Sequence, residues 1–254
     1  MDDRQREKAR AFATLHEKGN PLILFNVWDA GSAKAVAEAG AKALGTGSWS
    51  VAAAYGLGDG EALSMNDAIA NFRRITAAVE LPVTLDFEGG YAVAPGDVAD
   101  NVAWVVSAGG VGINFEDQVV GGEGLHPAVD QAARIAAIRG RAGADFFINA
   151  RTDIFLKASP ETHDAAMLDS AIERARAYAD GGASGFFAPG LMDEALIARL
   201  CEAVALPVNI MAFPGVPEAK RLGELGVARV SHGPGPYRLV MKALGDAAKV
   251  AFVA

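Results

Sequence analysis

Short apolar runs alternate with helical patterns eight times along this chain, and this alternation constrains its fold more than any other feature. Each run turns polar at its C-terminal end, as buried parallel strands do. The predicted strands cover residues 22–28, 43–48, 83–88, 112–117, 146–151, 185–190, 207–212 and 227–233. Their average spacing of about 29 residues matches the repeat of a (β/α)8 barrel.

The segments between the predicted strands have helical periodicity, most clearly in residues 30–40, 66–80 and 169–182. A doubly wound open sheet is the alternative fold. Such a sheet usually carries a glycine fingerprint after its first strand, and NVWDAGS is not one. We therefore predict one α/β domain over residues 1–254, a single (β/α)8 TIM barrel with an N-terminal helix.

Three glycines stand where predicted helices end. Gly40, Gly182 and Gly226 each follow a helical pattern, and a residue in the left-handed conformation commonly ends a helix at such a position. Glycine adopts that conformation without steric penalty. We therefore expect a positive φ at all three.

The charge balance excludes several classes of function. The chain has 23 Lys and Arg against 31 Asp and Glu, for a net charge of −8, so we expect neither a nucleic-acid nor a membrane partner. Its one cysteine, Cys201, rules out an internal disulfide framework. No apolar run approaches the roughly 18 residues of a membrane span, and no apolar signal core is present. A cytoplasmic location is expected.

Acidic side chains gather at the ends of the third and fourth predicted strands. Asp86 and Glu88 are two residues apart and share one side of their strand, and Glu116 ends the neighbouring strand. Active sites of such barrels lie at these strand ends. Three crowded carboxylates need a cation, and oxygen ligands favour Mg²⁺, with Mn²⁺ as the alternative. The other interpretation is that these acids cap helices or pair with arginines.

Further polar residues at strand ends suggest anion binding. Arg151 can bind a carboxylate with two hydrogen bonds, unless it pairs with Asp153 or Glu116. The GTGS turn, residues 45–48, offers backbone N–H groups and two hydroxyls as an anion cradle. Asn209 ends the seventh strand and is a further candidate for substrate binding.

The histidines divide into two pairs. His126 and His232 lie near strand ends, and His126 is a candidate for proton transfer, although a surface position at a helix start is equally expected. His16 and His163 lie in helix or loop context and are predicted to be solvated.

Along nearly its whole length, the chain resembles the isocitrate lyase / phosphoenolpyruvate mutase superfamily. The resemblance is carried by FNVWDAGSAKAVAEAGAKALGTGSWSVAAAYG, LPVTLDFEGGYA, GINFEDQ, INARTDIF and RVSHGPGPYR. Members are Mg²⁺-dependent barrel enzymes that make or break C–C or P–C bonds of 2-oxo acids. The resemblance implies that Asp86, Glu88 and Glu116 hold Mg²⁺ directly or through water.

The resemblance also assigns roles to other residues. It implies that Thr46, Gly47 and Ser48 bind the substrate carboxylate or oxyanion together with Arg151. Asp59 falls in the stretch that corresponds to the mobile gating loop after the second strand, residues 57–64, and is a candidate catalytic residue.

Three departures from the family pattern narrow the reaction. Glu88 replaces the usual second aspartate of the third strand, and the turn around residues 48–50 carries one extra residue. The lyase branch has a Lys-Lys/Arg-Cys-Gly-His motif whose cysteine supplies the catalytic proton, whereas this chain reads Gly-Glu-Gly-Leu-His at 122–126. Cleavage of isocitrate or 2-methylisocitrate by the usual mechanism is therefore not expected.

The leading hypothesis is a Mg²⁺-dependent lyase that acts on a small 2-oxo acid, such as oxaloacetate, through a metal-stabilised enolate. Decarboxylation needs no cysteine acid, because water can protonate the enolate. Two alternatives stay open. One is P–C chemistry on phosphonopyruvate, with Asp59 nearest the phosphoryl group. The other is a barrel that binds a 2-oxo acid without turnover.

Members of this superfamily form dimers or tetramers and often exchange a C-terminal helix. The last residues, AAKVAFVA, are apolar enough to require a partner surface. We therefore expect a homodimer or homotetramer. The chain stops soon after the helix that begins near Pro236, which leaves the helix exchange itself open.

Overall fold

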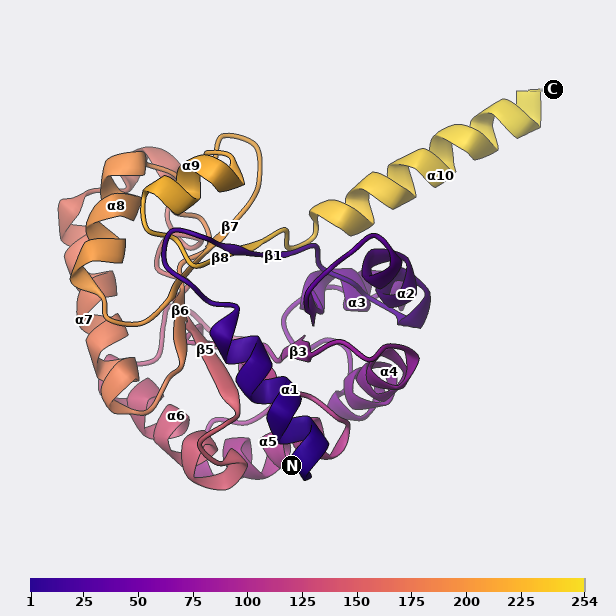
Figure 1. The fold of residues 1–254 in the computed structure, drawn as a ribbon. Helices are drawn as coiled ribbons and strands as arrows, with labels where there is room; N and C mark the ends of the chain where they lie inside the picture. Colours follow the sequence, from indigo (N-terminus) through magenta and orange to yellow (C-terminus); the bar gives the residue numbers. More distant parts are fainter. Residues whose placement is uncertain (254) are drawn as a thin grey trace.

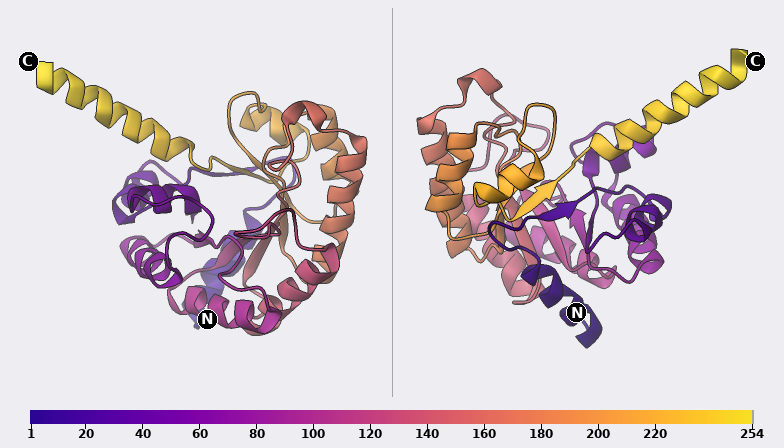
Figure 2. Two further views of the ribbon diagram at one scale, coloured as in Figure 1. Left: turned by 180° about the vertical axis from the view of Figure 1, so that it is seen from behind. Right: turned by 45° about the horizontal axis from the view of Figure 1, so that its top comes forward.

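Eight parallel strands form a nearly closed ring inside a layer of helices (Figures 1 and 2) in the computed structural model, which describes residues 1–253. The strands are β1 (Leu22–Leu24), β2 (Leu44–Gly45), β3 (Val83–Asp86), β4 (Gly112–Glu116), β5 (Phe147–Arg151), β6 (Gly185–Phe187), β7 (Val208–Met211) and β8 (Arg229–Ser231). Their order is β1-β8-β7-β6-β5-β4-β3-β2, and a parallel bridge between Val27 and Thr46 joins the two ends. The predicted (β/α)8 barrel is confirmed.

The helices follow the strands as predicted. They are α1 (Asp3–Thr14), α2 (Ala30–Glu38), α3 (Ser48–Ala54), α4 (Met65–Ala78), α5 (Pro95–Ser107), α6 (Ala128–Ala142), α7 (Ala165–Asp180), α8 (Glu194–Ala203), α9 (Ala219–Glu224) and α10 (Gly235–Val253), with a 3-10 turn at Pro160–Thr162. Gly40, Gly182 and Gly226 have φ of 99°, 94° and 91°, as expected. The strands predicted at 22–28, 43–48 and 227–233 are each four residues shorter than predicted, and α3 begins at Ser48, inside one of the predicted strands.

The main core lies between the strands and the helices. Successive strand side chains point to opposite faces, so Leu85, Ile113, Phe115 and Ile148 pack outward in the largest apolar cluster. The inward-facing positions are polar instead, and they are buried: Thr84, Asn114, Asn149, Asn209, Arg229 and Ser231. Barrel interiors are more often filled by branched apolar side chains. The lumen below the strand ends is therefore a hydrogen-bonding environment.

Helix α1 packs at the amino-terminal end of the barrel, where Phe12 and His16 contact Phe147 of β5. The imidazole of His16 stacks on Phe147 with ring centroids 4.1 Å apart and is only 8% exposed. The prediction that His16 is solvated is therefore wrong. The helical pattern of α1 did not reveal that this end of the helix is covered by the barrel.

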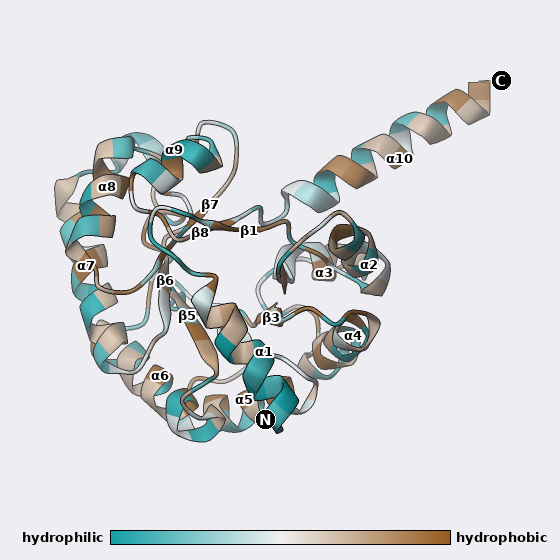
Figure 3. Ribbon diagram, viewed as in Figure 1, coloured by the Kyte–Doolittle hydropathy of each residue, from teal (hydrophilic) through white to brown (hydrophobic). Residues whose placement is uncertain are grey.

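Helix α10 points away from the barrel (Figures 1 and 2), and Pro236 is its one buried residue within the described chain. Its exposed apolar side chains include Leu239, Met241, Leu244 and Phe252. Figure 3 shows brown, hydrophobic stretches along this helix. No helix within residues 1–253 is both long and apolar enough to cross a membrane.

Candidate active site

A cavity of about 150 Å³ opens where the strands end at the carboxyl side of the barrel. The last residues of β3, β5, β6, β7 and β8 contribute to its wall. Its lining comprises Asn26, Gly47, Ser48, Trp49, Asp59, Asp86, Asn114, Arg151, Leu156, Phe187, Pro189, Met211, Ser231, Gly233 and Pro234. A cavity of this size suits a small metabolite, since sites for drug-sized ligands run from roughly 300 to 1,000 Å³.

Asp86 is the predicted metal ligand that lines this cavity. Its Oδ2 accepts a 2.9 Å hydrogen bond from the backbone N–H of Ser48, and its Oδ1 accepts one of 3.3 Å from the side chain of Asn114. Its own backbone N–H donates to the hydroxyl of Thr46 over 2.9 Å. Thr46 therefore supports Asp86 from β2, whereas Gly47 and Ser48 reach the cavity directly.

Arg151 enters the cavity from β5 and forms both of the ion pairs considered from sequence. Its Nη1 lies 2.8 Å from Glu116 Oε2, and its Nε and Nη2 lie 2.5 and 2.9 Å from the two carboxylate oxygens of Asp153. Burial lowers the pKa of Arg151, but the three acids Glu116, Asp153 and Asp86 raise it further, so the net pKa is well above the usual value. A guanidinium has five N–H donors. Glu116 and Asp153 together accept from three of them, so two N–H groups of Arg151 are left for a ligand.

Glu88 and Glu116 do not line the cavity. Both are buried, and their carboxylates have protein partners: Glu88 accepts from the backbone N–H of Glu61, and Glu116 binds Arg151 and Gln118. Burial and the nearby Asp59 charge raise the pKa of Glu88 to about 7. Burial likewise raises the pKa of Glu116.

The acidic residues nevertheless fit a hard divalent cation. Burial is the main cause of the raised pKa of Glu88 and of Glu116, and the charge of Asp86 adds to both shifts. Within residues 1–253, no three His, Cys, Asp or Glu side chains are placed to hold a metal ion jointly. Magnesium often takes one or two carboxylates and keeps several waters. Asp86 alone among the three predicted ligands fits an ion that keeps most of its waters, whereas Glu88 and Glu116 lie outside the cavity lining and bind protein partners.

Asp59 lies on the loop after α3 and lines the cavity. Partial burial and the charge of Asp86 raise the pKa of its carboxyl, and a hydrogen bond to Ser48 opposes that rise. The predicted gating loop, residues 57–64, therefore contributes to the cavity wall in this structure.

Besides Thr46, Glu88 and Glu116, two further predicted residues lie outside the cavity lining. His126 is half-buried beside the network of Arg174, whose guanidinium binds the His126 carbonyl oxygen. Asn209 is buried below the cavity floor and donates a 3.1 Å hydrogen bond to the Ser231 hydroxyl. Neither side chain is among those that line the cavity.

Sequence reasoning did not single out Asn114 as a site residue, although it lines the cavity and holds Asp86. A signal was present, because Asn114 is two residues before Glu116 and must share its side of β4. A polar residue inside an otherwise apolar strand was the available clue.

The match to known families covers nearly the whole chain. The family model described as phosphoenolpyruvate phosphomutase matches residues 12–252. The chain belongs to this family. Family members include lyases and mutases, and both are enzymes of the superfamily predicted from the sequence motifs.

Three similar proteins illustrate that range. A solved structure from Burkholderia cenocepacia, provisionally named a phosphonomutase, is 50% identical with a TM-score of 0.94, and the match covers 97% of this chain and 99% of that one. The 2-methylisocitrate lyase of Escherichia coli is 32% identical over 82% of this chain and 71% of its own length. The oxaloacetate decarboxylase of Pseudomonas savastanoi pv. phaseolicola is 26% identical over 93% and 82%.

Proposed function

We propose that this protein is a Mg²⁺-dependent lyase that decarboxylates or cleaves a small 2-oxo acid resembling oxaloacetate. The observation that carries the proposal is one small cavity that brings together Asp86, Arg151 and Ser48. A cation-binding carboxylate and an anion-binding guanidinium face the same space. This is the pair that a chelating 2-oxo carboxylate requires.

The chain's own residues bind and orient the substrate. The two uncommitted N–H groups of Arg151 bind a carboxylate, and Glu116 and Asp153 hold the guanidinium in place. Gly47 and Ser48 form the adjoining wall. When bound at Asp86, Mg²⁺ supplies positive charge that offsets the charge developing on the substrate oxygen.

In the decarboxylation, the bond between C3 and C4 of the substrate breaks and C4 leaves as CO₂. The electron pair of that bond passes to the enolate of pyruvate, which takes a proton from water. Asp59, on the loop that covers the cavity, lies where it can order that water. The step therefore does not need the catalytic cysteine of the lyase branch, which this chain lacks at residues 122–126.

A second candidate reaction is cleavage of the P–C bond of phosphonopyruvate. It is favoured by the 50% identity to the Burkholderia protein provisionally named a phosphonomutase and by the position of Asp59 in the cavity wall. Phosphate release from phosphonopyruvate distinguishes this reaction from decarboxylation.

The experiment is a coupled pyruvate-release assay with Mg²⁺ on oxaloacetate, phosphonopyruvate and 2-methylisocitrate in parallel. We expect pyruvate from oxaloacetate above the rate with metal alone, and loss of that signal with EDTA. No turnover of any substrate, with binding of a 2-oxo acid retained, would contradict the lyase and favour a non-catalytic binding barrel.

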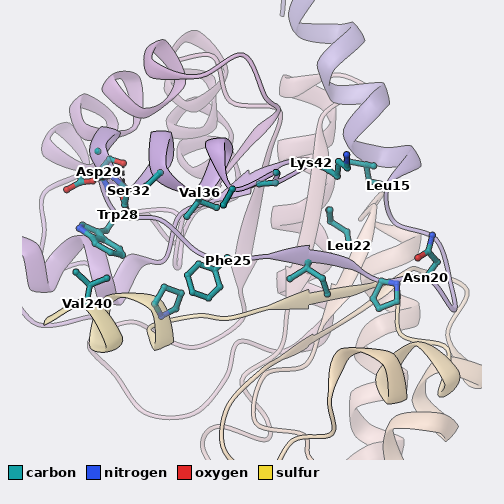
Figure 4. Close-up of a pocket in the computed structure, with 18 residues that line it drawn as sticks. Leu15, Asn20, Leu22, Phe25, Trp28, Asp29, Ser32, Val36, Lys42 and Val240 are labelled. Atoms are coloured by element: carbon teal, nitrogen blue, oxygen red, sulfur yellow. Dashed lines mark hydrogen bonds between the residues drawn. The ribbon is translucent and has the colours of Figure 1, made fainter. Parts of the chain in front are cut away.

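We also propose that the protein is a homo-oligomer in which α10 of one copy packs against another copy. A groove of about 1060 Å³ runs beside β1 and α2 (Figure 4), where Phe25, Trp28 and Val36 offer an apolar surface. Helix α10 has an unpartnered apolar face and starts at the edge of this groove, where Pro236 and Val240 contribute to the lining. An apolar helix and an apolar groove on one chain are complementary between copies.

A further inference from the structure

The barrel lumen holds a buried cation that the proposed reaction does not use. Arg229, the first residue of β8, is fully buried, and its guanidinium lies below the cavity floor. Its Nε donates to the Ser231 hydroxyl over 3.0 Å, and its Nη2 donates to Asn114 Oδ1 over 3.1 Å. Both acceptors line the cavity, whereas Arg229 does not.

The charge of Arg229 is not neutralised by a close acid. Within residues 1–253 no carboxylate forms an ion pair with it, its Nη1 has no hydrogen-bond partner, and the acid that acts on its charge from farther away is Asp86. Arginine stays protonated even in such surroundings. A buried charge is costly to keep, and Asp86 offsets that of Arg229 only without direct contact, through the shared Asn114. The arrangement therefore favours an additional anion that binds nearby.

The hydrogen bonds around Ser231 determine which way its hydroxyl points. A hydroxyl has two acceptor lone pairs and one donor proton. Arg229 Nε and Asn209 Nδ2 donate to the oxygen over 3.0 and 3.1 Å, and so occupy both lone pairs. The remaining O–H has to donate, and Ser231 lines the cavity. The floor therefore presents a hydrogen-bond donor backed by a positive charge.

Asn114 is oriented in the same way. Its Oδ1 accepts from Arg229 and, over 2.9 Å, from Asn149. Its amide NH₂ is consequently directed to the cavity side, where it donates to Asp86. Arg229 thus fixes two donors at once without reaching the cavity itself.

We propose that Ser231 contacts an oxygen of the bound substrate, and that Arg229 is the positioning residue that makes the cavity floor select a second anionic group. This inference rests on the proposed function, because Arg151 is taken to bind the first carboxylate. Ser231 and Arg151 reach the cavity from β8 and β5, which are separated by β6 and β7. A ligand that touches both has two oxygen-bearing ends.

Oxaloacetate and phosphonopyruvate, the candidate substrates, both carry such a second anionic group, so Ser231 and Arg229 are the residues that select them over a monocarboxylic 2-oxo acid. A matched probe pair is malate and 2-hydroxybutanoate, which have the same carbon chain and differ in the terminal carboxylate. Neither loses CO₂ by the proposed reaction, so binding is measured without turnover. Failure of the lyase assay therefore leaves this test intact.

The experiment is calorimetric titration of both probes, with Mg²⁺ present, into the wild-type chain and into Ser231→Ala, Arg229→Met and Arg229→Lys. We expect the wild type to prefer malate, and Ser231→Ala to reduce that preference about tenfold, as expected for a lost hydrogen bond to a charged group. Arg229→Met should abolish the preference, and Arg229→Lys should restore part of it. Affinity for 2-hydroxybutanoate should change little in each variant.

The matched control is Thr84→Val, which removes a buried hydroxyl that does not line the cavity and that finds no hydrogen-bond partner among residues 1–253. It should keep the malate preference. An unchanged preference in Ser231→Ala, or an equal loss of both probes, would overturn the proposal. If Arg229→Met does not fold, Ser231→Ala decides the question alone.

Discussion

The backbone N–H of Glu61 donates a 2.6 Å hydrogen bond to the carboxylate of Glu88, and this contact ties the loop after α3 to the end of β3. The Glu61 carboxylate in turn accepts from the backbone N–H of Tyr91 over 2.8 Å. These three are the non-glycine residues with positive φ among those described, at 59°, 48° and 56°. Such conformations cost energy and persist where surrounding contacts enforce them, so the closed loop depends on this pair of hydrogen bonds.

Removing the Glu88 carboxylate should release the loop. In Glu88→Ala the Glu61 N–H loses its acceptor, whereas Glu88→Gln keeps an acceptor oxygen at the same place. We expect limited proteolysis within residues 57–64 to be about tenfold faster in the alanine variant than in wild type, with the glutamine variant in between. Equal cleavage rates in all three proteins would show that the loop is held by other contacts.

Arg151→Lys should abolish most activity while leaving the fold intact. Lysine keeps a positive charge between Glu116 and Asp153 but lacks the planar fork that binds a carboxylate with two hydrogen bonds. We expect kcat/KM on the best substrate to fall about 100-fold or more, as for a misplaced substrate. Wild-type kinetics in this variant, at an unchanged Tm, would remove Arg151 from the site.

Asp86→Asn should weaken binding of the divalent ion, because it removes the one acidic ligand candidate on β3 that lines the cavity. We expect Mn²⁺ affinity, measured by electron paramagnetic resonance, to fall at least about tenfold. Asp193→Asn at the exposed start of α8 is the control and should bind as wild type does. Unaltered Mn²⁺ binding in Asp86→Asn would place the ion elsewhere.

Acid should destabilise the protein through His16. Burial and the nearby charge of Arg229 lower the pKa of His16 to about 3, from 6.5 when exposed. Because the folded pKa is the lower one, the unfolded state binds more protons, and stability is lost as the pH falls below about 6.5. Linkage gives a loss of about 2 kcal/mol between pH 7 and pH 5.

Urea unfolding at the two pH values measures this effect. His16→Phe keeps a ring between Phe12 and Phe147 but cannot take up a proton. Its stability should therefore fall by about 2 kcal/mol less than that of wild type over the same interval. An identical pH dependence in both proteins would assign the acid sensitivity to other groups.

A charge on the apolar face of α10 should break the proposed assembly. Leu244 is 60% exposed in the single chain. Leu244→Glu is expected to shift the protein from an oligomer to a monomer in light scattering after gel filtration, without loss of Tm of the barrel. Lys242→Glu, on the same helix and already polar, serves as control. A monomeric wild-type protein would contradict the assembly directly.

The sequence was sufficient to predict the barrel and to single out several residues that line the cavity. Apolar runs that turn polar at one end reveal parallel strands, and this pattern is local, so the strand ends could be found without a structure. Asp86 and Arg151 were predicted on this basis, and both line the cavity. The glycines at 40, 182 and 226 end helices for an equally local reason, the freedom of glycine at positive φ.

Only the tertiary structure decided which partners the polar groups have. Glu88 and Glu116 look equivalent to Asp86 in sequence, yet they bind Glu61 and Arg151, because those choices depend on distances between segments far apart in the chain. The periodicity of β8 places Arg229 and Ser231 on one face but does not reveal that the face is a polar lumen. Whether a charged side chain lies in water or inside a closed barrel depends on all eight strands together. Its burial therefore cannot be predicted from a short stretch of sequence.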